Sequence, residues 1–268
     1  PIAVALNCGF GADGMVPHVE AMQPWAVPVA VYPNAGLPNQ FGEYDETPET
    51  MARKLKPLLS GGMLNMVGGC CGTTPEHIEA IAREAGWSPA RVVPQPRHEM
   101  MLAGLEAVTV SPDRNFMNIG ERCNVAGSRK FLRLIKEKKI DEAIEIARGQ
   151  VEAGAQVVDL NMDDAMLDTV GEISDFVSRI GMEPDVARVP LMIDSSSWDA
   201  ILAGLKRVQG RPIVNSISLK EGETKFIERA MMVREMGAAV VVMAFDEQGQ
   251  ADTRERKIDV CRRAYELL

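Results

Sequence analysis

Hydrophobic residues in this chain gather into short runs that are separated by longer stretches with helical periodicity. The runs are rich in β-branched residues and have few polar interruptions, which is typical of strands covered on both faces of a parallel sheet. We predict eight strands, at residues 2–7, 27–32, 63–68, 116–120, 156–162, 189–194, 211–217 and 238–245.

Three stretches between these runs carry helix signals. Residues 48–60 follow Thr47, a suitable N-cap, begin with Pro48 and end at two glycines. Residues 74–86 repeat the same order of signals, and residues 129–153 place apolar side chains largely on one face. Strands that alternate with helices predict an α/β fold, with a barrel and a doubly wound sheet as the alternatives.

A segment with four prolines, residues 88–112, interrupts this alternation. We predict a linker at 91–112, between a first part at 1–90 and a second part at 113–268. Three predicted strands precede the linker and five follow it. Neither part therefore has the eight strands that close a barrel.

Composition and charge narrow the functional classes. The chain has 29 basic and 38 acidic residues, a formal net charge of −9, and no basic stripe, so nucleic acid is not an expected partner. No apolar stretch approaches the ~20 residues that span a bilayer, and the start does not resemble a signal peptide. We expect a soluble, cytoplasmic protein. Its five cysteines do not suggest a secreted disulfide framework and favour metal or thiol chemistry.

Two adjacent cysteines, Cys70 and Cys71, stand between glycines after a predicted strand and before a predicted helix. Cys8 follows the first predicted strand in the same way. Such βα turns are where α/β proteins assemble their sites, so the three thiols could converge on one tetrahedral zinc with an open fourth position. The alternative is that the adjacent pair is two small buried residues.

Longer motifs cover essentially the whole chain. The first part contains "ALNCGFG", "YPNAGLPNQFGEYDETPETMA" and "NMVGGCCGTTPEHI", which are similar to the end of the homocysteine-binding barrel of the cobalamin-dependent methionine synthase family. The second part contains "NIGERCNVAGSRKF", "VVDLNMDDAMLD", "VPLMIDSSSWDAILAGLK", "IVNSISLKEG" and "VVVMAFDEQGQADTRERK", which are similar to the start of its methyltetrahydrofolate-binding barrel.

The resemblance implies an α/β fold with two (β/α)8 TIM-type barrels, both incomplete here: the last three strands of the first and the first five of the second. It implies methyl transfer from 5-methyltetrahydrofolate via cobalamin to zinc-activated homocysteine, giving methionine and tetrahydrofolate. Cys8, Cys70 and Cys71 would hold the zinc, which deprotonates a bound thiol. Cobalamin would belong to a module of the parent protein that is absent from this chain.

The resemblance also implies a pterin site made of acids and amides at the strand ends of the second part. A carboxylate accepts from the amino and ring N–H groups of a pterin, and a carboxamide both donates and accepts. The implied residues are Glu121, Asn124, Asp194 and Asn215, with Asp159 and Asn161 as further candidates. For Asp159 and Asp194 the alternative is an N-cap role.

Other functions stay open. A zinc thiol methyltransferase that uses betaine would explain residues 1–86 alone, and a dihydropteroate synthase would explain the pterin residues alone. A non-catalytic partial gene product with structural cysteines is a further alternative.

Several remaining residues with reactive side chains receive structural roles. We expect Cys123 to be a bystander small residue rather than a reactive thiol, and Cys261 to be a core residue. His18, His77 and His98 have no partner at ligand spacing, so we expect them to be solvated or capping residues.

Overall fold

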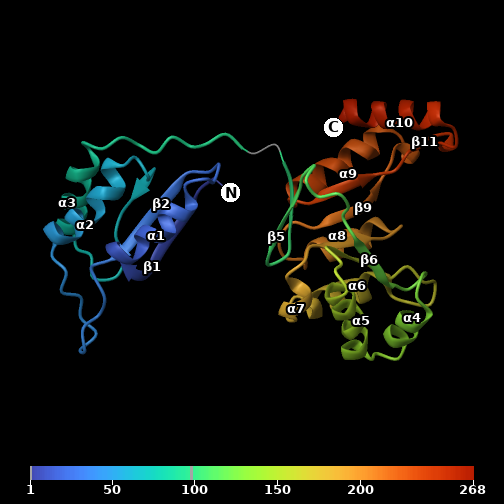
Figure 1. The fold of residues 1–268 in the computed structure, drawn as a ribbon, viewed down its shortest axis with the longest axis horizontal. Coiled ribbons are helices and arrows are strands. Elements are labelled where there is room, and N and C mark those ends of the chain that lie inside the picture. Colours follow the sequence, from blue (N-terminus) through green and yellow to red (C-terminus); the bar gives the residue numbers. More distant parts are fainter. Residues whose placement is uncertain (1, 97–98) are drawn as a thin grey trace. The chain divides into compact units, whose positions relative to one another are not determined.

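A computed structural model describes residues 2–96 and 99–268 of the chain. The chain forms two compact units, Pro1–His98 and Glu99–Leu268, drawn in blue to teal and in green to red in Figure 1. His98, for which we expect a solvated or capping role, lies outside the described residues.

The first unit is a three-stranded parallel sheet with helices between and after its strands. Its elements are β1 (Val4–Gly11), α1 (Ala12–Met22), β2 (Val29–Asn34), α2 (Pro48–Ser60), β3 (Met66–Val67) and α3 (Pro75–Ala85), with sheet order β1-β2-β3. The two predicted helices begin where their signals stand, because Thr47 accepts from the backbone N–H of Thr50 and Thr74 forms a capping box with His77. The sequence did not reveal α1, which contains Pro17 and has no side-chain cap.

Arg91 shows that the predicted linker begins too early. Its side chain is 4% exposed, and its guanidinium donates to the backbone carbonyls of Gln23, Trp25 and Val27. The backbone N–H of Arg91 also donates to the carbonyl of Leu64. The first unit therefore includes Arg91, which anchors the turn between α1 and β2.

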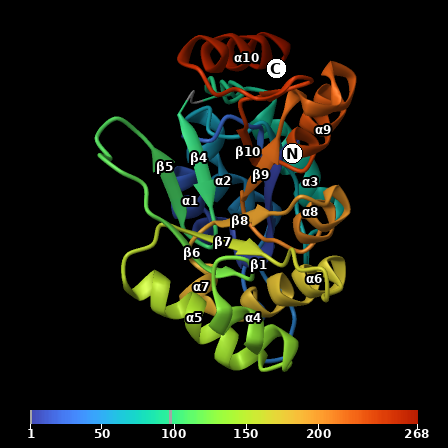
Figure 2. The same cartoon turned by 90° about the vertical axis from the view of Figure 1, so that its right-hand side faces the viewer.

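The second unit contains five parallel strands in the order β10-β9-β8-β7-β6, seen in Figure 2. These strands are β6 (Ile119–Asn124), β7 (Val157–Asn161), β8 (Leu191–Asp194), β9 (Ile213–Ile217) and β10 (Ala239–Val242). The helical elements are α4 (Arg129–Lys136), α5 (Ile140–Glu152), α6 (Thr169–Ile180), α7 (Pro184–Ala187), α8 (Trp198–Leu205), η1 (Leu219–Glu221), α9 (Glu223–Glu235) and α10 (Arg254–Leu267). The predicted α/β fold is thereby confirmed, while barrel closure stays a prediction. Across the described residues, no helix has both the length and the apolar character that a membrane crossing requires.

Three local predictions differ from the structure. The predicted linker contains an antiparallel hairpin, β4 (Met100–Ala103) and β5 (Ala107–Val110), and another short hairpin, β11 (Phe245–Asp246) and β12 (Gly249–Gln250), follows β10. The single helix predicted at 129–153 is two helices, because Lys138 between them takes a left-handed backbone angle, φ 57°.

The two faces of the five-stranded sheet have different roles. On the outer face, Val158, Leu160, Ile193 and Val214 belong to the large core shared with the surrounding helices. On the opposite face, the hairpin residue Leu102 packs with residues at the beginnings of four strands, namely Val157, Met192, Ile213 and Ala239. An apolar layer thus fills the amino ends of the strands, and polar residues of this face lie nearer the carboxyl ends.

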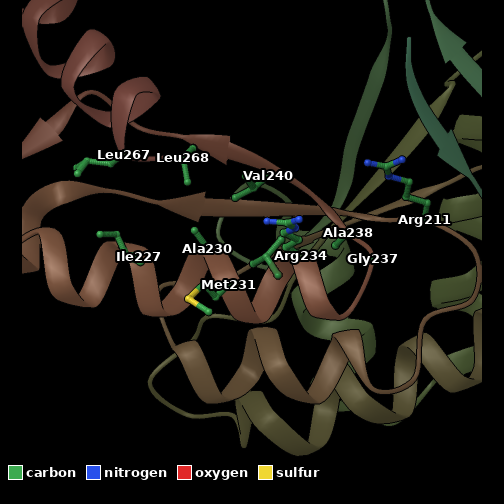
Figure 3. A pocket seen from close by; sticks show the side chains of 11 residues that line it. Arg211, Ile227, Ala230, Met231, Arg234, Gly237, Ala238, Val240, Leu267 and Leu268 are labelled. Carbon is green, nitrogen blue, oxygen red and sulfur yellow. The ribbon is translucent and has the colours of Figure 1, made fainter. Parts of the chain in front are cut away.

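A groove of about 430 Å³ lies along β10, between α9 and the end of α10 (Figure 3). Its apolar lining includes Ile227, Ala230, Val240 and Leu267. None of the described residues that line this groove is a predicted site residue.

Candidate functional site

The sulfur atoms of the three predicted zinc ligands converge in the first unit. The Sγ atoms of Cys8 and Cys71 are 3.6 Å apart, those of Cys70 and Cys71 are 3.9 Å apart, and all three lie within 4.8 Å of one another. Zn–S bonds of ~2.3 Å in a tetrahedron place sulfurs ~3.8 Å apart, so the cluster fits a zinc ion. Soft sulfur donors also suit zinc chemically.

Burial and bonding argue against a purely structural role for the adjacent pair. Cys70 is only partly buried and Cys71 is exposed, so the alternative of two buried small residues is wrong. All three cysteines are free, and their sulfurs are well beyond the ~2.05 Å of a disulfide bond.

Unusual backbone angles bring the thiols together. Cys8 lies at an irregularity of β1 with φ 63°, in the left-handed region that residues other than glycine seldom adopt. Gly72 follows the adjacent pair with φ 76°, and a Cβ atom there would lie 2.2 Å from the Cβ of Tyr44. Only glycine therefore allows both this turn and the close packing of Tyr44.

Asn34 supports the cysteine pair and was not predicted. It is the last residue of β2, is 3% exposed, and its Oδ1 accepts from the backbone N–H of Cys71 at 3.1 Å. The N–H of Cys70 donates to the carbonyl of Pro33, and the N–H of Ala35 donates to the carbonyl of Cys71. The end of β2 thus fixes the adjacent cysteines. The only sequence signal for this role of Asn34 is that a polar residue stands at the end of a strand.

The three thiols have different electrostatic surroundings. The backbone N–H of Gly9, followed by contacts with Cys71 and Cys70, lowers the pKa of Cys8. Burial, followed by the neighbouring thiols, raises the pKa of Cys70. Cys8 is therefore more readily a thiolate than Cys70 in the metal-free protein.

Four predicted pterin residues form one level row across the second unit. The strand register pairs Asn124 with Asn161, Asn161 with Asp194, and Asp194 with Asn215. The Nδ2 of Asn161 donates to the Oδ2 of Asp194 at 2.9 Å. The last residues of β6, β7 and β8, together with Asn215 in the middle of β9, thus present one carboxylate among three amides.

Asp159 lies two residues before Asn161 on the same face of β7, because side chains alternate along a strand. It is 2% exposed, and neither of its carboxylate oxygens has a hydrogen-bond partner among the described residues. Burial, and then the charges of Asp194 and Glu121, raise the pKa of Asp159 to about 7. Burial also raises the pKa of Asp194. The N-cap alternative is wrong for both, since Asp168 caps α6 and Ser197 caps α8.

Asp163 joins two loops of this site and was not predicted. Its carboxylate accepts from the hydroxyl of Ser195 and from the backbone N–H of Ser196, both at 2.6 Å. These serines directly follow Asp194, so Asp163 fixes the chain beside it. The only sequence signal for this role of Asp163 is that a further acidic residue follows β7.

The remaining residues with reactive side chains follow their expected roles, apart from one. Cys123 is fully buried, and burial raises its pKa to about 12, which makes it inert as expected. His77 caps α3, as predicted, and His18 is exposed and stacks on Phe10. Cys261 is exposed, so its predicted core role is wrong. The helical pattern around it did not reveal which face of α10 packs inward.

Comparison with known families agrees with both halves of this description. Residues 1–85 match the homocysteine S-methyltransferase family, and residues 120–268, more than half of the chain, match the pterin binding enzyme family. This order of the two matches agrees with the resemblance to methionine synthases across both domains. The chain therefore belongs to the pterin binding enzyme family and carries a homocysteine S-methyltransferase part ahead of its pterin-binding part.

Proposed function

We propose that this chain serves methyl transfer from 5-methyltetrahydrofolate, via cobalamin, to homocysteine, as cobalamin-dependent methionine synthases do, with methionine and tetrahydrofolate as products. The observation that carries the proposal is that one chain holds both a three-sulfur cluster of zinc dimensions and a row of pterin-type donors and acceptors. A betaine enzyme would leave the second feature unexplained, and a dihydropteroate synthase the first.

In the first unit, Cys8, Cys70 and Cys71 would hold the zinc, with Asn34 orienting the adjacent pair. Bound zinc would lower the pKa of the homocysteine thiol, which has its ordinary value near ~8.5, and so supply a thiolate at neutral pH. The exposed position of Cys71 leaves the cluster open to a substrate.

In the second unit, the Asp194 carboxylate would accept from the amino and ring N–H groups of the pterin, while Asn215 and Asn124 would supply amide contacts. Glu121, Asp159 and Asn161 would complete the polar wall. We assign cobalamin to another module of the parent protein, and we propose that each sheet is part of a (β/α)8 barrel.

Replacement of Asp194 tests the pterin half. Asp194→Ala should weaken binding of 5-methyltetrahydrofolate by about 1–3 kcal/mol in calorimetry, because the N–H donors of the ring lose their acceptor. Asp199→Ala is the matched control, since Asp199 is an exposed residue of the nearby helix α8. Equal affinity of the Asp194 variant and the unaltered chain would exclude this assignment.

A further inference from the structure

Gln150 of α5 contacts β6 through both ends of its side-chain amide. Its Oε1 accepts from the backbone N–H of Arg122 at 2.7 Å, and its Nε2 donates to the Sγ of Cys123 at 3.3 Å. Gly120 completes the contact, because a Cβ atom there would lie 2.7 Å from the Oε1 of Gln150. The glutamine amide thus contacts β6 at positions 120, 122 and 123, and at position 120 it occupies space that only glycine leaves free.

These contacts lie where β6 contains one extra residue. Gly120 pairs with Val158 and Cys123 pairs with Leu160, so three steps on β6 match two steps on β7. Such a bulge leaves a backbone N–H outside the ladder, and here Gln150 accepts from the N–H of Arg122.

The bulge also decides which side chains share a face. In a regular strand, Glu121 and Asn124 are three residues apart and would point to opposite faces. Because β6 has one extra residue, the two faces exchange after the bulge. Cys123 therefore faces the outer core, and Asn124 lies level with Asn161 of the polar row. Glu121 can then share the face of Asn124.

We propose that Gln150 is a positioning residue, which holds the β6 bulge and thereby directs Glu121 toward Asp159 and Asp194. The charge of Glu121 raises the pKa of both aspartates, in agreement with this placement. The expected effect of Gln150 on 5-methyltetrahydrofolate binding rests on the proposed pterin function, whereas its effect on the arrangement of the three acids does not.

The first arm of the test needs no ligand. Gln150→Met keeps a side chain of similar size and removes the acceptor for Arg122. The pKa of Asp159, followed by carboxyl-carbon NMR, should fall because Glu121 moves away. The same substitution should leave that pKa unchanged in a Glu121→Gln background. Gln156→Met is the matched control, since Gln156 Oε1 accepts from the N–H of Asn118, ahead of the bulge.

The second arm measures affinity for 5-methyltetrahydrofolate. Gln150→Met should weaken binding on the order of tenfold in the otherwise unaltered chain and by less than about twofold in the Glu121→Gln background, as coupled residues do. Gln150→Glu keeps an acceptor for the Arg122 N–H, so it should retain most of the affinity. If Gln150→Met does not fold, Gln150→Leu, which also lacks an acceptor, takes its place in both arms.

Three outcomes separate the possibilities. An unchanged Asp159 titration in Gln150→Met, or an equal loss of affinity in both backgrounds, would overturn the positioning role. An Asp159 titration that shifts as expected, in a chain that binds no 5-methyltetrahydrofolate, would support the positioning role and reject the proposed function.

Discussion

In the first unit, the cysteines stand where the backbone leaves regular geometry, at the β1 irregularity and in the turn that contains Gly72. In the second unit, Asn161, Asp194 and Asn215 pair level with one another on neighbouring parallel strands, and the register shifts only after Asn215. Both sites use the carboxyl ends of parallel strands, where α/β folds assemble chemistry. A metal ion needs ligands that converge on one point, whereas a flat ring can bind along a row of hydrogen-bond donors and acceptors.

The two sites also differ in how they treat charge. Cys8 and Cys70 are partly buried and Cys71 is exposed, and the backbone N–H of Gly9 lowers the pKa of Cys8. The second unit buries the carboxylate of Asp159 beside Asp194, with no hydrogen-bond partner among the described residues for Asp159. The first site therefore favours the ionised form of Cys8 while it disfavours that of Cys70, and the second site makes ionisation of Asp159 costly through burial.

The largest effect should come from the metal ligands. Cys8→Ala, Cys70→Ala and Cys71→Ala should each reduce bound zinc from about one ion per chain to roughly a tenth or less, because a site with two thiolates loses much of its binding free energy. Mass spectrometry of the metal content measures this. Cys261→Ala removes an exposed cysteine outside the cluster and should keep the zinc. Full zinc in all three variants would show that the cluster is not a metal site.

The second effect concerns pH and the buried carboxyl of Asp159. Its pKa in the folded protein, about 7, is above its ordinary value of 3.8, so the folded state binds the proton more tightly. Stability should therefore fall as pH rises from about 4 to 7. The Asp159→Asn variant does not lose stability in this way. Its free energy of unfolding should exceed that of the unaltered chain by near zero at pH 4 and by roughly 4 kcal/mol at pH 8.

Urea denaturation followed by fluorescence can isolate this effect in the second unit. Trp198 is the tryptophan of that unit, so replacing Trp25 and Trp87 by Phe leaves one reporter. Asp199→Asn is the matched control because Asp199 is exposed. A pH-independent difference between Asp159→Asn and the unaltered chain would contradict the raised pKa.

The third effect tests whether β2 orients the cysteine pair. Asn34→Ala should weaken zinc binding by about 10- to 100-fold, the usual consequence of removing a residue that supports metal ligands. Asn65→Ala is a matched control, because Asn65 also bridges backbone groups, accepting from Val29 and donating to Arg91. Competition with a chromophoric chelator gives both affinities. Equal losses in the two variants would mean that Asn34 acts only through general stability.

The sequence predicted the strands well because each is a continuous apolar run with breakers at its ends. The predicted strand boundaries were less accurate where backbone geometry determines them. The structure gives β3 only two residues, and β6 begins at Ile119 instead of residue 116. The hairpin residue Leu102 was assigned to a linker, although it is fully buried against the sheet. Local composition does not show which distant residues will cover an apolar segment.

The site was predicted in part. Family resemblance pointed to the three cysteines and the polar row, which the fold brings together in two separate groups. The supporting residues Asn34, Asp163 and Gln150 were missed, because each acts through a contact between segments far apart in the chain. Such contacts have no periodic signal in the sequence.

The smallest effect tests the turn after the adjacent cysteines. Gly72→Ala and Gly62→Ala both place a side chain at positive φ, 76° and 61°, and this backbone strain alone should cost each variant about 1–2 kcal/mol of the free energy of unfolding. Only at position 72 does the new Cβ collide with Tyr44, because at position 62 the nearest atom is 3.5 Å away. Gly72→Ala should therefore also weaken zinc binding, whereas Gly62→Ala should not. Urea denaturation and chelator competition separate the two effects, and equal zinc affinity in both variants would show that the turn does not set the cysteine geometry.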